Sequence, residues 1–354
     1  MKNKSFAFIL SLFVLSCIYA QNEDTVTFKE YYASGKVATQ GFKNKKNIKV
    51  GDWVWYYENG EVLSKGKYDD KGWKVGIWQW FYSNGDLKKQ EVLTGDGENK
   101  AYYDNKQLYF ECKVIDGKRQ GDYKEYHKNG KVKMQGFYKD NELDGDCKWW
   151  YSNSNPEMEG TLKNGKRNGH WIYYYRDNGN KNSEGNFVND LEEGRWVYYY
   201  ETKEKWREGE YIHGRREGLW KTYYENGRIL HQGSYVGGKE EGVWISYFSN
   251  GEIQMRGKFS NGNMDGKWEM FNADGSHKTD VTYSDGLKNG TETLYDENGN
   301  MYQKADYKDG VLNGRWEKYF MGKLVEKGTY KDGNKTGKWA FYDERGKEIE
   351  SREF

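Results

Sequence analysis

The chain has 354 residues, and its 56 basic and 55 acidic side chains leave a formal net charge of only +1. This balance provides neither a basic footprint for nucleic acid nor a polybasic patch for an anionic membrane surface. With 15 tryptophans, 32 tyrosines and 15 phenylalanines beside 44 glycines and a single proline, aromatic side chains must form most of any core.

Residues 1–20 have the composition of a signal peptide. Lys2 and Lys4 precede an apolar run that ends in a small-residue cleavage site at Ala20. The run is shorter than the roughly 20 residues that span a membrane. A lipobox ending at Cys17 is the alternative, with that cysteine carrying a lipid anchor. We expect simple cleavage, a mature net charge of −1, and an exported protein in the periplasm, at the cell surface or in the medium.

The rest of the chain repeats with a period of about 24 residues, which is the signature of a repeat architecture. The pattern is clearest from Gly218 to Glu241, because the next copies begin at Gly242 and Gly266. A partial copy near Phe28 precedes the full ones, so about fourteen copies fill residues 21–354 as a single repeat domain. Full copies open on glycine at positions 51, 76, 97, 121, 145, 169, 194, 218, 242, 266, 290, 314 and 337.

Two aromatic columns and two turn signals recur from copy to copy. Asn-Gly dipeptides such as Asn226-Gly227 adopt tight hairpin turns, and a second glycine-containing turn such as Asp285-Gly286 closes each copy. Trp stands two residues after the opening glycine at positions 53, 78, 171, 196, 220, 244, 268, 316 and 339. The fifth residue after that glycine is always aromatic, at positions 56, 81, 102, 126, 150, 174, 199, 223, 247, 271, 295, 319 and 342.

Two turns in each copy leave two strands of about six residues, rich in the aromatic residues that strands favour. Glycine interrupts every run before a helix could form three turns. We therefore predict an all-β repeat protein of about fourteen stacked antiparallel β-hairpins that form a long twisted meander sheet. Some 28 strands at ~4.8 Å would extend about 130 Å as a curved, elongated ribbon. Kinks are expected in the least regular copies, at residues 76–100 and 152–159, the latter around Pro156.

Two cysteines follow residue 20. If each copy supplies two neighbouring strands, Cys112 and Cys147 lie three strands apart, about 14 Å. A disulfide tolerates at most about 7 Å between Cα atoms. We therefore expect two free thiols, with Cys147 in a position that usually holds Trp.

The pattern G-x-W-x-x-Y-Y-x-N-G-x5-G-x-Y-x2-G resembles the MORN-repeat-variant family of bacterial proteins, which are often labelled YwqK-family antitoxins. The resemblance covers residues 27–354, and it implies stacked β-hairpins and an interaction role without a shared catalytic site. The signal peptide departs from the family, and an exported protein cannot neutralise a cytoplasmic toxin. A weaker likeness is to choline- or wall-binding repeats, in which Trp stands directly beside the Tyr pair. Here two residues intervene, as between Trp220 and Tyr223.

No catalytic, cofactor or zinc motif emerges from the repeat. The oxygen-rich string Asn261–Gly266 resembles a calcium loop, but Asn272 stands where a glutamate is required and no helices flank the string. We therefore expect no enzyme, no cofactor and no metal site. The histidines fall in different copies at inconsistent places, which favours surface positions for all five: His127, His170, His213, His231 and His277.

A column of tyrosines beside the always-aromatic column is the candidate binding feature. Adjacent strand residues point to opposite faces, so both faces of the sheet carry aromatic side chains and a single layer cannot bury them all. The Trp and always-aromatic columns are expected to form the core, and the tyrosine column to line a groove for peptides, glycans or partner strands. The candidate residues are Tyr57, Tyr82, Tyr103, Tyr151, Tyr175, Tyr200 and Tyr224.

These patterns favour a non-enzymatic, exported repeat scaffold that binds an unknown protein partner along an extended β surface. The alternative is a carbohydrate- or cell-wall-binding protein that uses stacked Tyr and Trp residues. We expect no nucleic-acid partner, and no transmembrane segment once the signal peptide is removed.

Overall fold

The computed structural model describes residues 24–354, so the expected signal peptide and Cys17 lie outside the described residues. All regular elements in the described part are β-strands, joined as antiparallel hairpins in chain order. No helix there has the length and apolar character needed to cross a membrane. The predicted all-β meander of hairpins is confirmed. Contacts within the chain group the residues into two compact units, one ending at Gln120 and the other running from Gly121 to Phe354.

The first unit contains eight complete strands, and the pairing between consecutive strands from β1 to β8 is antiparallel throughout. A ninth strand, β9 (Lys118–Tyr126), begins in this unit and ends in the second. The eight strands are β1 (Thr25–Tyr31), β2 (Val37–Asn44), β3 (Lys49–Tyr56), β4 (Val62–Tyr68), β5 (Lys74–Phe81), β6 (Leu87–Val92), β7 (Gly97–Tyr102) and β8 (Leu108–Ile115).

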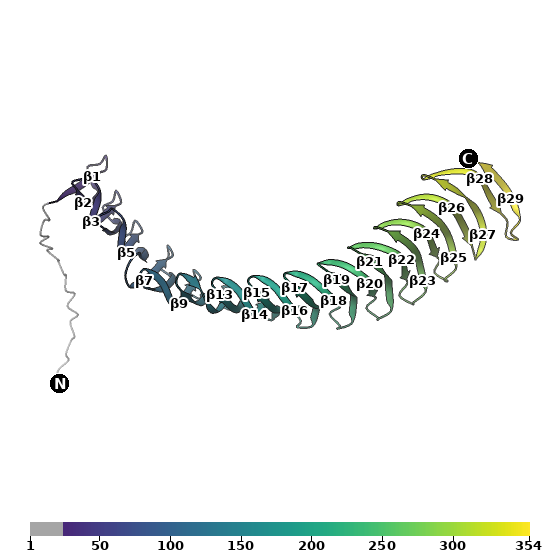
Figure 1. Ribbon diagram of the computed structural model, residues 1–354, viewed down its shortest axis with the longest axis horizontal. Helices are drawn as coiled ribbons and strands as arrows, with labels where there is room; N and C mark the ends of the chain where they lie inside the picture. Colours follow the sequence, from purple (N-terminus) through teal and green to yellow (C-terminus); the bar gives the residue numbers. More distant parts are fainter. Residues whose placement is uncertain (1–23) are drawn as a thin grey trace, which may run out of the picture. The chain divides into compact units, whose positions relative to one another are not determined.

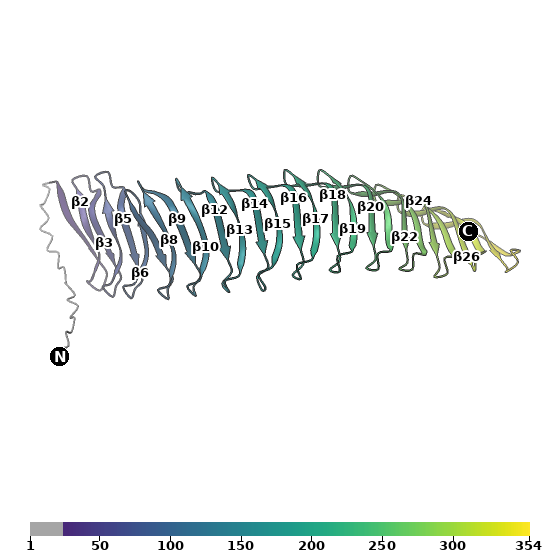
Figure 2. The same ribbon diagram turned by 90° about the horizontal axis from the view of Figure 1, so that it is seen from below.

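The second unit is also a meander of antiparallel strands, and its hairpin turns lie along two opposite edges of its sheet (Figures 1 and 2). Its strands are β10 (Val132–Lys139), β11 (Glu142–Leu143), β12 (Gly145–Trp150), β13 (Pro156–Lys163), β14 (Lys166–Tyr174), β15 (Lys181–Val188), β16 (Leu191–Tyr199), β17 (Lys205–Ile212), β18 (Arg215–Tyr223), β19 (Ile229–Val236), β20 (Lys239–Tyr247), β21 (Ile253–Ser260), β22 (Asn263–Phe271), β23 (His277–Ser284), β24 (Leu287–Tyr295), β25 (Met301–Lys308), β26 (Val311–Phe320), β27 (Lys323–Lys331), β28 (Asn334–Tyr342) and β29 (Glu348–Glu353).

The opening glycine of a copy forms a β-bulge. Gly218 has a φ of 64°, a left-handed conformation that side chains with a Cβ disfavour. Around it the register slips, so that residues 218–220 lie opposite the single residue Gly209. Such a bulge re-aims the side chain that follows it. Here it directs Trp220 back over the preceding copy.

The Trp of one copy packs on a strand glycine of the copy before it. A Cβ placed on Gly209 would lie 2.2 Å from the ring of Trp220, so only glycine fits beneath the indole. The indole Nε1 donates to the carbonyl oxygen of Glu210 at 3.1 Å. We call this arrangement the indole lock. It recurs, with indole Nε1 bonded in the same way, for Trp53, Trp78, Trp171, Trp196, Trp244 and Trp268.

The Trp column forms the core, as predicted, and Trp53, Trp78, Trp171, Trp268 and Trp339 are almost completely shielded from solvent. The face of the sheet that carries them is called the Trp face below.

The always-aromatic column does not join that core, contrary to expectation. Tyr199 and Tyr223 are only half-buried. Each stands an odd number of residues after the Trp of its copy and therefore points to the opposite face. There the Tyr199 hydroxyl donates to Glu184 at 2.5 Å and the Tyr223 hydroxyl donates to Glu208 at 2.6 Å.

Cys112 and Cys147 are free, buried thiols, as predicted. Burial raises the pKa of both thiols. Cys147 occupies the Trp position of its copy. It lies over Gly136 as Trp220 lies over Gly209, and a Cβ on Gly136 would be 2.7 Å from the Cys147 Sγ. The copy opened by Gly97 has Asn99 in that position instead, and the Asn99 Oδ1 accepts the backbone N–H of Val92. The expected kinks and the 130 Å extent stay predictions.

Candidate binding surface

The seven candidate tyrosines stand where the first strand of each copy enters its turn, and all are half-buried. The hydroxyl of Tyr200 donates to the carbonyl oxygen of Tyr223 in the next copy at 2.8 Å. Tyr175 reaches the carbonyl of Tyr199 in the same way at 2.7 Å. We call this contact the tyrosine lock. It is also made by Tyr57, Tyr82, Tyr151 and Tyr224.

The ring of Tyr103 packs against the ring of Tyr109, with 5.0 Å between the centroids. The column therefore ties neighbouring copies together through its hydroxyls while leaving the rings partly exposed. That role was not apparent in the sequence, because it depends on the distance between adjacent copies.

A lateral row of side chains lies beside the Trp column on the Trp face. Tyr198 follows Trp196 by two positions and so shares its face. The strand register places Ser183 and Arg207 directly opposite Tyr198 on its two sides. In the second unit this Trp-face row consists of Glu125, Met134, Trp149, Met158, Tyr173, Ser183, Tyr198, Arg207, Thr222, His231, Ser246, Met255, Met270, Thr279, Leu294, Gln303, Lys318, Glu326, Phe341 and Glu350.

The row and the Trp column interleave but differ in how they vary along the chain. The rings of Tyr173 and Trp196 stack with centroids 6.5 Å apart, and Trp196 and Tyr198 are 6.0 Å apart. Trp recurs in most copies, whereas the row position that follows it by two residues ranges from Trp149 to Lys318. Sequence reasoning missed this row. The signal for it was a variable position between two repeated ones.

A groove opens where a small row residue lies between two large ones. Ser183 is buried between Tyr173 and Tyr198. The groove above it has a volume of about 620 Å³. Its lining includes Tyr151, Met158, Arg167, Tyr173, Tyr175, Ser183, Phe187, Trp196 and Tyr198. Two of the seven candidate tyrosines, Tyr151 and Tyr175, are thus brought to one groove.

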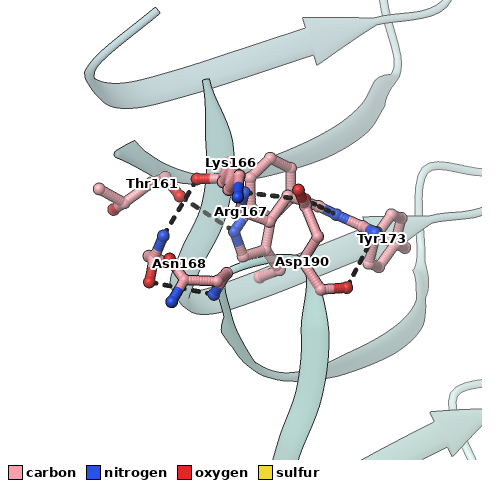
Figure 3. A network of polar contacts seen from close by, with 8 residues as sticks. Thr161, Lys166, Arg167, Asn168, Tyr173 and Asp190 are labelled. Carbon is pink, nitrogen blue, oxygen red and sulfur yellow. Dashed lines mark hydrogen bonds and ion pairs between the residues drawn. The ribbon is translucent and has the colours of Figure 1, made fainter. Parts of the chain in front are cut away.

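Arg167 lines this groove, and its guanidinium is already paired with the Asp190 carboxylate (Figure 3). Its Nε donates to Asp190 Oδ1 at 3.1 Å and its Nη1 to the hydroxyl of Tyr173 at 3.2 Å. Its guanidinium also lies 4.0 Å from the ring centroid of Phe187. The backbone N–H and the guanidinium of Arg167 both lower the pKa of Asp190. This cluster holds the groove's lining in place.

The opposite face consists largely of paired charges. Burial alone would raise the pKa of Glu208, but hydrogen bonds from Tyr223, Arg195 and Lys205 outweigh it and lower that pKa to about 2. Burial and the Glu184 carboxylate raise the pKa of Tyr199 to about 12. Because these groups use their hydrogen bonds on one another, the opposite face offers few free polar contacts.

The five histidines lie in separate copies, each with its own surroundings. Within residues 24–354, no three His, Cys, Asp or Glu side chains come close enough to hold a metal ion. In the calcium-like string, Asn261 and Gly262 form the tight turn between β21 and β22, both with positive φ. The contacts of the histidines are His127 with the Trp150 carbonyl, His170 with Glu184, His213 with Glu193, His231 with the Trp244 ring and His277 with Asp280.

The solved structures that match this chain include two Tc toxin structures, both of low similarity. One is the Photorhabdus luminescens Tc holotoxin pore with the TccC3-D651A mutation, at 11% identity and a TM-score of 0.17, covering 92% of this chain and 21% of that chain. The other is the TcdB2-TccC3-Cdc42 structure, at 11% identity and a TM-score of 0.16, covering 93% of this chain and 23% of that chain. This chain spans about a fifth of the length of those chains. No curated protein matches the sequence significantly.

A family model described as the MORN repeat variant matches the chain in seven segments, in both units. The segments are residues 49–70, 74–92, 119–140, 143–164, 216–236, 240–261 and 288–309. Each begins two residues before an opening glycine and spans the hairpin that follows. The match thus repeats with the period of the fold, and the chain belongs to the MORN-repeat-variant family.

Proposed function

We propose that the chain is a non-enzymatic, exported repeat scaffold that binds a protein partner along the Trp-face row. The observation that carries the proposal is the contrast between the repeated Trp column and the varied row beside it. A polysaccharide repeats its units, and a surface matched to it would repeat as well. A polypeptide changes from residue to residue, and so does this row.

A second line of support is that the two faces of the sheet differ in how far their side chains are free to contact a partner. The side chains of the opposite face pair with one another, as Glu208 does with Arg195 and Lys205. The Trp face has half-buried Tyr and Met side chains and an open groove around Ser183. Half-buried aromatic and Met side chains are enriched at protein interfaces. The rings of Tyr151 and Tyr175 would add contact area at the edge of that groove.

Capture from the envelope fraction, with paired variants, tests the site. Met158→Lys and Met255→Lys place a charge on the Trp-face row. Leu219→Lys and Val243→Lys place the same charge on exposed apolar residues that are adjacent to Trp220 and Trp244 in the strand and so point to the opposite face. A partner that is captured by residues 21–354 and by the two control variants, but not by the row variants, supports the proposal. Equal capture by all four variants contradicts it.

A carbohydrate- or cell-wall-binding role is the second candidate, favoured by the Tyr- and Trp-lined groove. Saturable binding to purified peptidoglycan or polysaccharide, lost in Met158→Lys and kept in Val243→Lys, would replace the protein partner with a glycan.

Export is tested separately, by mass spectrometry of the N-terminus of the protein recovered from the envelope or the medium. Gln21 at the N-terminus indicates simple cleavage, whereas a lipid-modified Cys17 indicates an anchored protein. An intact Met1 in the cytoplasmic fraction would contradict export.

A further inference from the structure

Arg207 lies in the middle of the Trp-face row, pressed among three aromatic rings. Its guanidinium carbon is 4.4 Å from the ring centroid of Tyr198, 4.8 Å from that of Trp206 and 5.5 Å from that of Trp220. These rings come from β16, β17 and β18 in turn. Arginine stacks well on aromatic faces, and stacking leaves the N–H groups at the edge of its plane unused.

Arg207 also lacks a polar partner in residues 24–354. Its side chain makes no hydrogen bond and no ion pair there, and its Nε is buried without a bond. Two other arginines that contact aromatic rings on the same face are satisfied. Arg167 is bonded to Asp190 and Tyr173, and Arg216 donates to the hydroxyl of Tyr235 at 3.0 Å. A half-buried donor without a partner is uncommon in folded proteins, and a bound ligand is one way to satisfy it.

The immediate neighbours of Arg207 in the row carry no acidic group. The register sets Thr222 beside Arg207 and His231 beside Thr222, so the three form consecutive members of the row across β17, β18 and β19. Burial, and then the charge of Arg207, lower the pKa of His231 and favour its neutral form. The neighbouring Glu208 faces the other way and is bonded to Tyr223. The positive charge of Arg207 therefore has no carboxylate partner within the row.

We propose that Arg207 binds a carboxylate of a peptide segment that lies along the Trp-face row, an inference that rests on the proposed scaffold function. The guanidinium offers parallel N–H donors, and a carboxylate accepts two of them at once. The aromatic surroundings strengthen that pair by excluding water. The groove around Ser183, one row position beyond Tyr198, would hold apolar side chains of the same segment.

Peptide isosteres test the chemistry directly. Residues 21–354 are bound to an array of 12-residue peptides, in which each Asp or Glu has an Asn or Gln counterpart and each C-terminus is either free or amidated. Peptides that bind should lose about tenfold to hundredfold in affinity when the recognised carboxylate becomes an amide. Dependence on a side chain or on the free C-terminus shows which carboxylate is recognised.

Variants of Arg207 test whether this residue causes the preference for the carboxylate form of a peptide. Arg207→Gln should abolish the preference for the carboxylate form, and Arg207→Lys should keep part of it through charge alone. Arg215→Gln is the matched control, because Arg215 is exposed on the adjacent strand and should leave the preference unchanged. If Arg207→Gln does not fold, the isostere pairs on the unchanged protein and the Arg207→Lys variant still decide.

The outcomes separate the two proposals. Peptides that bind equally well as acid and amide, or a preference that survives in Arg207→Gln, would overturn the carboxylate site and leave the scaffold standing. Binding of polygalacturonate that depends on Arg207, with no peptide binding, would show that the carboxylate belongs to a glycan and overturn the peptide assignment. No peptide binding together with no captured partner would overturn both proposals.

Discussion

At the scale of single residues, the indole lock explains which positions need glycine. Gly209 lies under Trp220 and has no room for a Cβ. Where Glu292 replaces Trp, the opposing residue is Val281 and not glycine. Ala305 faces Trp316, which is half-buried, whereas Trp339 over Gly328 is almost completely shielded from solvent. Trp244 over Gly233 is half-buried as well, so glycine gives the indole room to pack but does not by itself shield it from solvent.

Gly209→Ala should destabilise the copies on both sides of the lock by about 1–3 kcal/mol, because the new methyl group forces Trp220 off its site. Hydrogen exchange of β17 and β18 amides measures the effect. Glu210→Ala is the control, since it removes an exposed side chain and keeps the carbonyl that Trp220 uses. Unchanged exchange in Gly209→Ala would mean that the indole moves freely.

The ion pairs of the opposite face make stability depend on pH. Hydrogen bonds from Arg256 and then Lys267 lower the pKa of Glu269 to about 2, below the ~4.3 of an unfolded chain. A lowered folded-state pKa stabilises the fold above the unfolded value, and that contribution is lost as pH falls towards 2.

Glu269→Gln should therefore raise hydrogen exchange in β22 relative to the unchanged protein near pH 6, by about 1 kcal/mol. The difference should shrink steadily between about pH 5 and pH 2. The exposed Glu297→Gln serves as the control and should show no such trend. A difference that stays constant down to pH 2 would rule out ionisation of Glu269 as its source.

At the scale of the hairpin, the strands and turns could be predicted because their signals are local. Asn-Gly and the glycine spacing fix two turns in each copy, and the aromatic content fixes the strands between them. The bulge at Gly218 and the register that sets Arg207 beside Tyr198 could not be predicted, since they depend on pairing between strands. For the same reason the tyrosine column was recognised, but its hydroxyl contacts were not.

Tyr200→Phe tests the tyrosine lock. Removing the hydroxyl leaves the Tyr223 carbonyl without its donor, which should cost about 1 kcal/mol and speed hydrogen exchange in the adjacent turns about fivefold. Tyr302→Phe makes the same change at an exposed tyrosine of β25 and should leave exchange unchanged. If both variants change hydrogen exchange equally, the tyrosine lock does not join neighbouring copies.

At the scale of the whole repeat array, each copy contacts its neighbours and little else, so stability should accumulate from adjacent pairs. Deleting residues 218–241 removes one full period. Trp244 then falls where Trp220 packed on Gly209, and the Tyr247 carbonyl falls where Tyr200 found that of Tyr223. We expect the shortened chain to fold with unchanged strand content per residue, measured by circular dichroism.

Deleting residues 218–229 provides the contrast. It removes most of β18 and the turn after it, and it places Gln232 where Trp220 packed on Gly209. No indole can then pack there, and the next turn falls at the wrong edge of the sheet. This variant should lose strand content or aggregate. If both deletions behave alike, the 24-residue copy is not the unit of folding.

The two locks also determine where the second unit would yield to a mechanical load. A pull along the row acts on the junctions between copies in series, and the weakest junction parts first. Two junctions have neither lock. Between β23 and β24, Glu292 occupies the Trp position and Asn272 the tyrosine position. Between β25 and β26, Trp316 faces Ala305 instead of glycine, and Asp296 occupies the tyrosine position. The strands at both junctions remain joined by their backbone ladder and ordinary side-chain contacts. Under tension, the array should therefore break at one of these two junctions rather than where Trp220 and Tyr200 bind their neighbours.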